Sequence, residues 1–289
     1  MDEKALVRTL LEEQHPDLSG LALREVEGGW DNRMWRLGED LAVRMPRSPR
    51  APELLRAEHR WLPDLAPRLP LPVPVPMRLG APSARFPHLW SVTTWVSGHP
   101  ADLAPVTRGT RALAAFLTEL HRTAPEEVPL NPLRGGHPRE AVEDLEEYAR
   151  GIADPAHMDG ILEVWQAVAD APAWHLPPVW LHADLHPANV VSREGDLAGV
   201  LDFGELCAGD PATDLAAAWV LLPDGSADAF FAEYPADEAT VLRARGWALL
   251  RSLVLIQIGR AGDQGLPGGK PTWKPAGEKA LSRVIAPFP

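Results

Sequence analysis

Residues 180–205 constrain the fold and chemistry of this chain more than any other stretch. A short apolar approach leads to a turn that carries Asp184 and, five residues later, Asn189. Alternating apolar residues around a Gly-containing turn then predict a β-hairpin over residues 189–201. The hairpin leads into Asp202, so we expect a second acid to return toward Asn189.

This arrangement of two acids and an amide is typical of phosphoryl transfer. We predict that Asp184 is the catalytic base, which accepts the proton of an attacking hydroxyl. Asn189 and Asp202 are the predicted Mg²⁺ ligands, because oxygen donors suit a hard cation. A metal-dependent hydrolase is an alternative, since His182-x-Asp184-x-His186 imitates a metal-binding triplet. That alternative needs further ligands and leaves Asn189 and Asp202 unexplained.

Three segments together resemble the aminoglycoside phosphotransferase family, which also contains choline-kinase-like and antibiotic-resistance enzymes. They are His-Ala-Asp-Leu-His-Pro-Ala-Asn at 182–189, Gly-Val-Leu-Asp-Phe-Gly at 199–204 and Gly-Asp-Pro-Ala-Thr-Asp-Leu-Ala at 209–216. The family usually has Gly where this chain has Ala183, a change that we expect to be tolerated. The resemblance implies that His182 and Asp214 support the catalytic loop structurally.

The resemblance covers almost the whole chain and implies a bilobed α+β fold of the protein-kinase-like class. Residues 1–96 are expected to form a β-rich nucleotide-binding lobe with a five-stranded sheet and a helix. Residues 97–289 are expected to form a mainly helical lobe with the catalytic loop, the metal site and the acceptor site. Apolar periodicity predicts, among others, a helix over residues 138–153 and another over residues 236–260.

The same resemblance implies a set of nucleotide-contacting residues, namely Gly28, Gly29, Arg44, Glu58, Thr94 and Val96. The glycines stand in a turn between strands, where a backbone without Cβ can approach phosphates closely. Arg44 replaces the lysine usual in kinases, and Glu58 on the following helix is its expected partner. Thr94 and Val96 follow from matching Gly98 to the family's hinge, whose backbone binds the adenine edge.

The implied function is ATP-dependent O-phosphorylation of a small molecule, an aminoglycoside or other antibiotic, with GTP as an alternative donor. A choline-like or sugar kinase is the nearest alternative, and a catalytically silent nucleotide-binding scaffold is another. The candidate acceptor residues are Glu205, Trp219, Asp228 and Glu233. The net charge of −12 suits a cationic acceptor and argues against a nucleic-acid partner.

Composition adds expectations about location. The single cysteine, Cys207, excludes an intramolecular disulfide and suits a reducing compartment. The charged N-terminus has no signal-peptide pattern, and no apolar run is long enough to span a bilayer. We therefore predict a cytoplasmic monomer or homodimer without a membrane partner.

Overall fold

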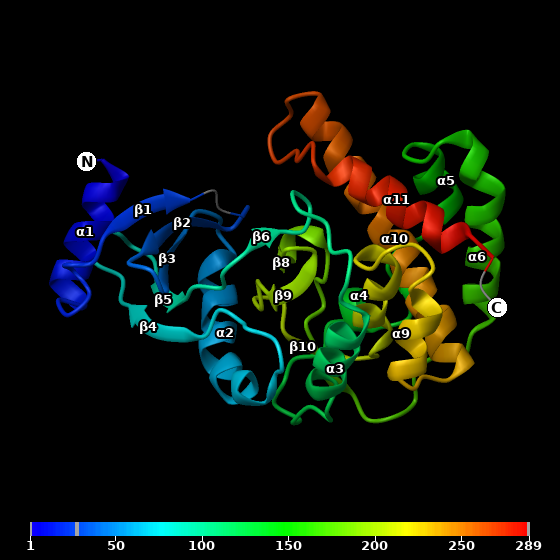
Figure 1. Ribbon diagram of the computed structural model, residues 1–289, viewed down its shortest axis with the longest axis horizontal. Helices are drawn as coiled ribbons and strands as arrows, with labels where there is room; N and C mark the ends of the chain where they lie inside the picture. Colours follow the sequence, from blue (N-terminus) through cyan, green and yellow to red (C-terminus); the bar gives the residue numbers. More distant parts are fainter. Residues whose placement is uncertain (1, 27–28, 288–289) are drawn as a thin grey trace. The chain divides into compact units, whose positions relative to one another are not determined.

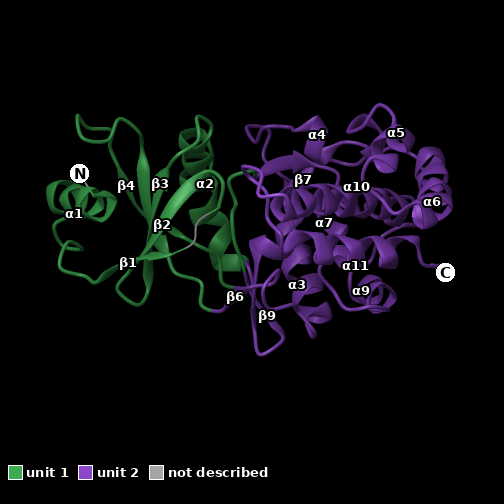
Figure 2. Cartoon of the chain, turned by 90° about the horizontal axis from the view of Figure 1, so that it is seen from above, with its two compact units in different colours: residues 1–68, 72–97, 200–205 green, residues 69–71, 98–199, 206–289 purple. Residues whose placement is uncertain are grey.

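The computed structural model describes residues 2–26 and 29–287. The chain forms two compact units (Figure 2). Unit 1 comprises residues 1–68, 72–97 and 200–205, and unit 2 comprises residues 69–71, 98–199 and 206–289. Unit 1 is built around a sheet and unit 2 is mainly helical, which confirms the predicted α+β class. The segment that carries Asp202 belongs to unit 1, although both its neighbours in sequence belong to unit 2.

Unit 1 contains a five-stranded sheet of order β1-β2-β3-β5-β4, in which all neighbours are antiparallel (Figure 1). Its strands are β1 (Leu23–Val26), β2 (Asn32–Leu37), β3 (Leu41–Pro46), β4 (Pro76–Gly80) and β5 (Trp90–Thr94). Its helices are α1 (Glu3–Gln14), α2 (Ala51–Leu65) and the 3₁₀ helix η1 (Ala66–Arg68).

The two sides of β3 explain how Arg44 reaches α2. Successive side chains of a strand point to opposite faces of the sheet. Val43 and Met45 join a core cluster with Leu10 and other residues of α1. Arg44 therefore points to the other face, where it contacts Glu58 of α2.

In unit 2, α10 (Glu238–Asp263) packs against α11 (Trp273–Ile285), α7 (Ala212–Leu215) and α6 (Met158–Asp170). The other helices are α3 (Thr110–Leu120), α4 (Pro132–Gly135), η2 (Pro138–Glu140), α5 (Leu145–Arg150), η3 (Pro155–His157), η4 (Pro187–Asn189), α8 (Ala217–Val220) and α9 (Ala227–Glu233). The remaining strands are β6 (His99–Pro100), β7 (Val179–Leu181), β8 (Val190–Arg193), β9 (Asp196–Val200) and β10 (Cys207–Gly209). Over the described ranges, no helix is both long and apolar enough to cross a membrane.

The predicted continuous helix over residues 138–153 is wrong. The structure has the 3₁₀ helix η2 at the start of this range, and α5 begins only at Leu145. The side chain of Asp144 accepts a hydrogen bond from the backbone N–H of Glu147 at 2.9 Å, so Asp144 caps a new helix instead of continuing an old one. The many carboxylates in this range also repel one another at helical spacing.

A buried ion pair connects α10 to the start of α7. Arg243 Nε lies 2.5 Å from Asp210 Oδ2, and both side chains are 2 % exposed. Arg243 also donates to the carbonyl of Pro172, and Asp210 accepts the backbone N–H of Ala212 at the start of α7. The pair therefore orients the segment that brings Asp214 to the catalytic loop.

Gly98 supplies a specific test of this backbone. Its φ is 140°, and a Cβ there would lie 2.2 Å from Val191 Cγ1 and 2.7 Å from the carbonyl oxygen of Ser192. We expect Gly98→Ala to lower the free energy of unfolding by about 3 kcal/mol, from backbone strain plus overlap. Gly225→Ala is the control, because its φ is 72° but its Cβ would meet open space. The control should cost only about 1 kcal/mol in urea unfolding. Equal losses of unfolding free energy in the two variants would show that the close packing around Gly98 does not affect stability.

Candidate active site

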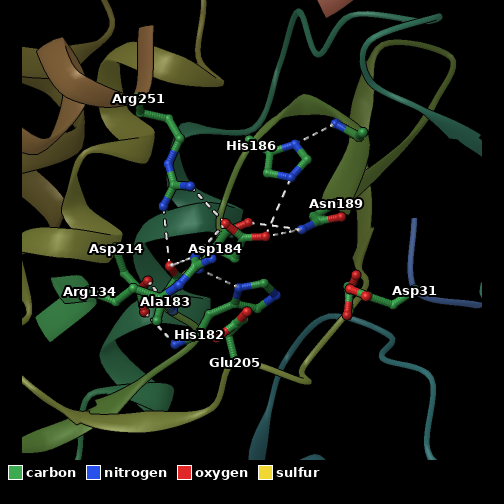
Figure 3. A network of polar contacts seen from close by, with 12 residues as sticks. Asp31, Arg134, His182, Ala183, Asp184, His186, Asn189, Glu205, Asp214 and Arg251 are labelled. Carbon is green, nitrogen blue, oxygen red and sulfur yellow. Dashed lines mark hydrogen bonds and ion pairs between the residues drawn. The ribbon is translucent and has the colours of Figure 1, made fainter. Parts of the chain in front are cut away.

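The predicted catalytic loop follows β7 and is held by the carboxylate of Asp214. The backbone N–H groups of His182 and Ala183 donate to Asp214 at 2.7 and 2.8 Å (Figure 3). Asp214 is fully buried. Burial alone would raise its pKa, but the hydrogen bond from His121, together with the attraction of His121 and His182, lowers it below the usual range. The structure thus places Asp214 at the loop that it was predicted to support.

Ala183 has a strained backbone in this loop. Its φ is 66°, in the left-handed region that residues other than glycine seldom adopt. A Cβ in this region costs roughly 1–2 kcal/mol. Ala is therefore accommodated at position 183 only at an energetic cost, which its small side chain does not remove.

Two arginines contact the predicted catalytic base, Asp184. Arg134 Nη1 and Arg251 Nη1 each donate to Asp184 Oδ1 at 2.7 Å (Figure 3). Both guanidinium groups also donate to the carbonyl of Ala183, at 3.1 and 3.2 Å. Arg134 comes from α4 and Arg251 from α10, so two separate helices orient one carboxylate.

The sequence predicted neither arginine. Arg134 lies in a four-residue helix within a Gly- and Pro-rich segment. Arg251 lies in the predicted long helix, but a helical pattern does not say which groups the helix approaches. The proximity of these residues to Asp184 depends on packing within unit 2.

These arginines set the charge of the loop. Burial alone would raise the pKa of Asp184, but Arg251, His186 and Arg134 together hold it well below its ordinary value. Asp184 is therefore a carboxylate at any working pH. One negative charge faces two positive guanidinium groups, so the immediate surroundings of Asp184 are net positive.

Asn189 is oriented by the same carboxylate. Its Nδ2 donates to the backbone carbonyl of Asp184 at 3.0 Å and to Asp184 Oδ2 at 3.2 Å. Because the nitrogen end of the amide is turned toward Asp184, the Oδ1 end points away from it (Figure 3). An oxygen presented in this way is suitable for a metal ligand.

The two histidines of the loop shape its backbone. His182 Nδ1 accepts the N–H of Asp184 at 3.2 Å, and His186 Nδ1 accepts the N–H of Ala188 at 3.3 Å. His186 also packs against the ring of Trp273, with centroids 4.6 Å apart. Among residues 2–26 and 29–287, no group of three or more His, Cys, Asp or Glu side chains is placed to hold a metal. Among these described residues, the hydrolase interpretation therefore has no ligand cluster to support it.

In unit 1, the structure brings Arg44, Glu58 and Asp202 together. Arg44 Nη1 donates to Glu58 Oε2, and Arg44 Nη2 lies 3.8 Å from Asp202 Oδ1. Arg44 and Glu58 are buried, whereas the Asp202 side chain is 46 % exposed. Burial and the charge of Asp202 together raise the pKa of Glu58 to about 7 against the attraction of Arg44. Asp202 has a φ of 60°, so this carboxylate also stands on a strained backbone.

The predicted phosphate-binding turn is anchored by arginines near the start of α2. Gly28 lies outside the described residues, and Gly29 is exposed. The guanidinium of Arg47 donates to the carbonyl of Gly29. Arg50 donates to both carboxylate oxygens of Asp31, at 3.1 and 2.7 Å, and to Glu205 at 2.6 Å. Glu205, a candidate acceptor residue, thus makes an ion pair within unit 1.

The hinge candidates lie at and just after the end of β5. The N–H of Thr94 donates to the carbonyl of Val75 at 2.9 Å, and its hydroxyl donates to the carbonyl of Val73 at 3.1 Å. Val96 is buried, two residues before Gly98. Thr94 therefore ties the extended segment before β4 to β5.

The remaining acceptor candidates lie elsewhere in unit 2. Trp219 is 2 % exposed and packs against Phe231. Trp219 and Asp228 contribute to the lining of a cavity of about 440 Å³ formed by α8, α9, α11 and adjoining loops. Glu233 makes an ion pair with Arg111 on α3 at 3.0 Å. The structure thus assigns these residues to contacts other than the loop of Asp184.

Comparison with known proteins identifies the family. The profile of the phosphotransferase enzyme family matches residues 22–253. This chain belongs to that family. No curated protein matches the sequence.

Solved structures confirm the predicted fold. The GDP complex of aminoglycoside 2'-phosphotransferase-IIIa has a TM-score of 0.71 and 20% identity, covering 99% of both chains. Macrolide 2'-phosphotransferase MphH from Brachybacterium faecium has a TM-score of 0.61 and 22% identity, covering 100% of both chains. A macrolide 2'-phosphotransferase of type I has a TM-score of 0.60 and 20% identity, covering 96% of both chains.

The Arg44–Glu58 pair generates a prediction on stability. In Arg44→Met, Glu58 stays buried without its partner, and we expect a loss of about 3 kcal/mol near pH 8. A buried acid whose folded-state pKa exceeds its unfolded-state value near 4.5 loses stability as pH rises between the two values. Without Arg44, the folded-state pKa of Glu58 rises above about 7, so the variant continues to lose stability as the pH rises past 7. The penalty measured by urea unfolding should therefore be smaller at pH 6 than at pH 8.

The matched control is Arg36→Met, which breaks the exposed pair with Glu39. An exposed pair contributes less than about 1 kcal/mol, with little pH dependence in this range. A penalty for Arg44→Met as small as that of the control would mean that the buried pair does not stabilise unit 1.

Proposed function

We propose that this phosphotransferase transfers the γ-phosphoryl group of ATP, with GTP as an alternative donor, to a hydroxyl of an antibiotic or similar small molecule. The observation that carries the proposal is the geometry of Asp184. Its carboxylate is ionised, oriented by Arg134 and Arg251, and joined to Asn189 within the family's loop motif. A fixed carboxylate of this kind can accept the hydrogen of an incoming hydroxyl.

Asp184 acts mainly by orientation in this proposal. A carboxylate with a strongly lowered pKa is a weak base, so it gains little from removing a proton before the phosphoryl group moves. It instead aligns the hydroxyl oxygen with the phosphorus and takes up the proton as the new P–O bond forms. This sequence suits a loose transition state, in which the nucleophile needs little prior activation.

Mg²⁺ fits the oxygen donors that the chain offers. Asn189 Oδ1 points away from Asp184, and the Asp202 carboxylate is partly exposed. We propose that these two side chains hold Mg²⁺, which would neutralise charge on the nucleotide phosphates. Arg44, with Glu58, is the proposed phosphate-positioning residue, and the turn predicted from Gly28 and Gly29 is proposed to cover the phosphates. The backbones of Thr94 and Val96 are proposed to meet the base.

The two guanidinium groups beside Asp184 favour an acceptor with few positive groups. The loop of Asp184 is flanked by two guanidinium groups, which repel ammonium groups. Glu233, one of the acceptor candidates, makes an ion pair with Arg111, and nearby Asp224 makes one with Arg283. We therefore favour a weakly charged antibiotic over a polycationic aminoglycoside. A cytoplasmic location and a monomeric or homodimeric state remain predictions from the sequence.

Asp184 and Asp202 should give different kinetic defects. We expect Asp184→Asn to lower kcat at least about 100-fold, because it removes the group that orients the hydroxyl. Its affinity for Mg·ATP should stay within a few-fold of wild type. Asp202→Asn should instead weaken Mg²⁺-dependent nucleotide binding. Titration with Mg·ATP and steady-state kinetics check both, and an unchanged Mg²⁺ dependence in Asp202→Asn would exclude its ligand role.

A screen for nucleotide consumption tests the acceptor. It should include aminoglycosides, macrolides, peptide and nucleoside antibiotics, choline and simple sugars, with ATP and GTP in parallel. We expect the best kcat/KM with an acceptor that has few ammonium groups, and an acceptor KM that changes little with ionic strength. A polycationic acceptor whose affinity falls as salt rises would contradict the charge argument. Turnover of choline or a sugar alone would favour the metabolite-kinase alternative.

A further inference from the structure

A chain of hydrogen bonds runs from α9 to the catalytic loop through buried groups. Tyr234 Oη lies 2.9 Å from His121 Nδ1, and His121 Nε2 lies 3.3 Å from Asp214 Oδ2. Asp214 then accepts the N–H groups of His182 and Ala183. The chain thus connects a tyrosine hydroxyl to the peptide next to Asp184.

The donors and acceptors of this chain form one consistent set. An ionised Asp214 can only accept, so His121 Nε2 carries the hydrogen that it donates. In the tautomer with its hydrogen on Nε2, His121 Nδ1 is an acceptor for the hydroxyl hydrogen of Tyr234. Burial raises the pKa of the Tyr234 phenol, and the charges of Asp214 and Asp210 raise it further, so the hydroxyl keeps its proton. His121 and Asp214 are 2 % and 0 % exposed at the side chain, which leaves water little access.

The three residues of this hydrogen-bond chain lie in, or directly after, three different helices. His121 is the C-cap residue that follows α3, and Tyr234 is the C-cap residue that follows α9. Asp214 belongs to α7. The rings of His121 and Tyr234 meet edge to face, with centroids 5.7 Å apart, and Tyr234 stacks on Phe230 of α9. Ring packing thus helps to orient His121 and Tyr234 for their hydrogen bond.

The hydrogen-bond chain ends at Ala183, the strained residue of the loop. Asp214 Oδ2 accepts the N–H of His182 and Oδ1 accepts the N–H of Ala183, so both peptide orientations are set. Ala183 has a φ of 66°, whereas a glycine would adopt this conformation without penalty. Relaxation of Ala183 toward negative φ would rotate its neighbouring peptides away from Asp214 and displace Asp184.

We propose that the Tyr234–His121–Asp214 chain is a positioning device that holds Ala183 in its left-handed conformation and so keeps Asp184 in place for the acceptor hydroxyl. The second part of this statement rests on the proposed function; the conformational part does not. Tyr234 and His121 are positioning residues, because they act through Asp214 and the loop backbone.

The test is a double-mutant cycle that combines Tyr234→Phe, in the hydrogen-bond chain, with Ala183→Gly. We expect Tyr234→Phe to lower kcat about 5- to 10-fold with an unchanged KM for ATP, because small displacements of a catalytic group are costly. His121→Gln should lower kcat further. In the Ala183→Gly background the effect of Tyr234→Phe should shrink to less than about twofold, because glycine does not need to be held.

Tyr148→Phe is the matched control, because it also removes one hydroxyl hydrogen bond in unit 2, from Tyr148 to Gln257 at 3.2 Å. It should leave kcat unchanged in both backgrounds. An equal loss of kcat from Tyr234→Phe with and without the Ala183→Gly substitution would overturn the proposal. So would a wild-type kcat in Tyr234→Phe. If His121→Gln does not fold, the tyrosine variants alone decide the question.

Amide hydrogen exchange separates this proposal from the proposed function. In wild type the amides of His182 and Ala183 should be strongly protected, and Tyr234→Phe should speed their exchange several-fold more than Tyr148→Phe does. Protection that is unchanged in Tyr234→Phe would refute the positioning chain even if phosphotransfer is observed. Faster exchange in a protein that phosphorylates no acceptor would support the chain and reject the proposed function.

Discussion

Two consecutive backbone N–H groups, those of His182 and Ala183, donate to the buried carboxylate of Asp214, and the catalytic loop depends on this interaction. A buried carboxylate needs such donors, since it has lost its hydration. The loop in turn needs the carboxylate, because Ala183 is held in a conformation that alanine disfavours. The same hydrogen bonds therefore stabilise the buried charge of Asp214 and hold Ala183, the residue before Asp184, in its strained conformation.

The same principle recurs at other buried carboxylates. Asp210, just before α7, is compensated by Arg243, and Glu58 on α2 is compensated by Arg44. Removing one member of such a pair leaves an uncompensated buried charge, which costs more than the intact pair contributes. These pairs therefore contribute little net stability, but they constrain how the segments that carry them pack within each unit.

The arginines on Asp184 change the expected chemistry of the site. Acidic composition suggested a pocket for a polycation, but several of those acids make ion pairs or cap helices. Net charge describes the whole surface, whereas acceptor selection depends on the few groups within about one Debye length of the reacting atoms. The guanidinium groups that contact Asp184 are those of Arg134 and Arg251, and with His186 they hold its pKa low.

The sequence by itself determined the α+β class, the phosphotransferase family and the groups most suited to its chemistry. Their signals are local: a loop motif, a hairpin, and a family resemblance that implies the pairing of Arg44 with Glu58. Only the tertiary structure decided what holds Asp184. Arg134 and Arg251 lie 50 and 67 residues from it, on helices whose periodicity says nothing about their neighbours. It also decided that Ala183 and Asp202 adopt positive φ, because long-range hydrogen bonds and packing override the local preference of these residues.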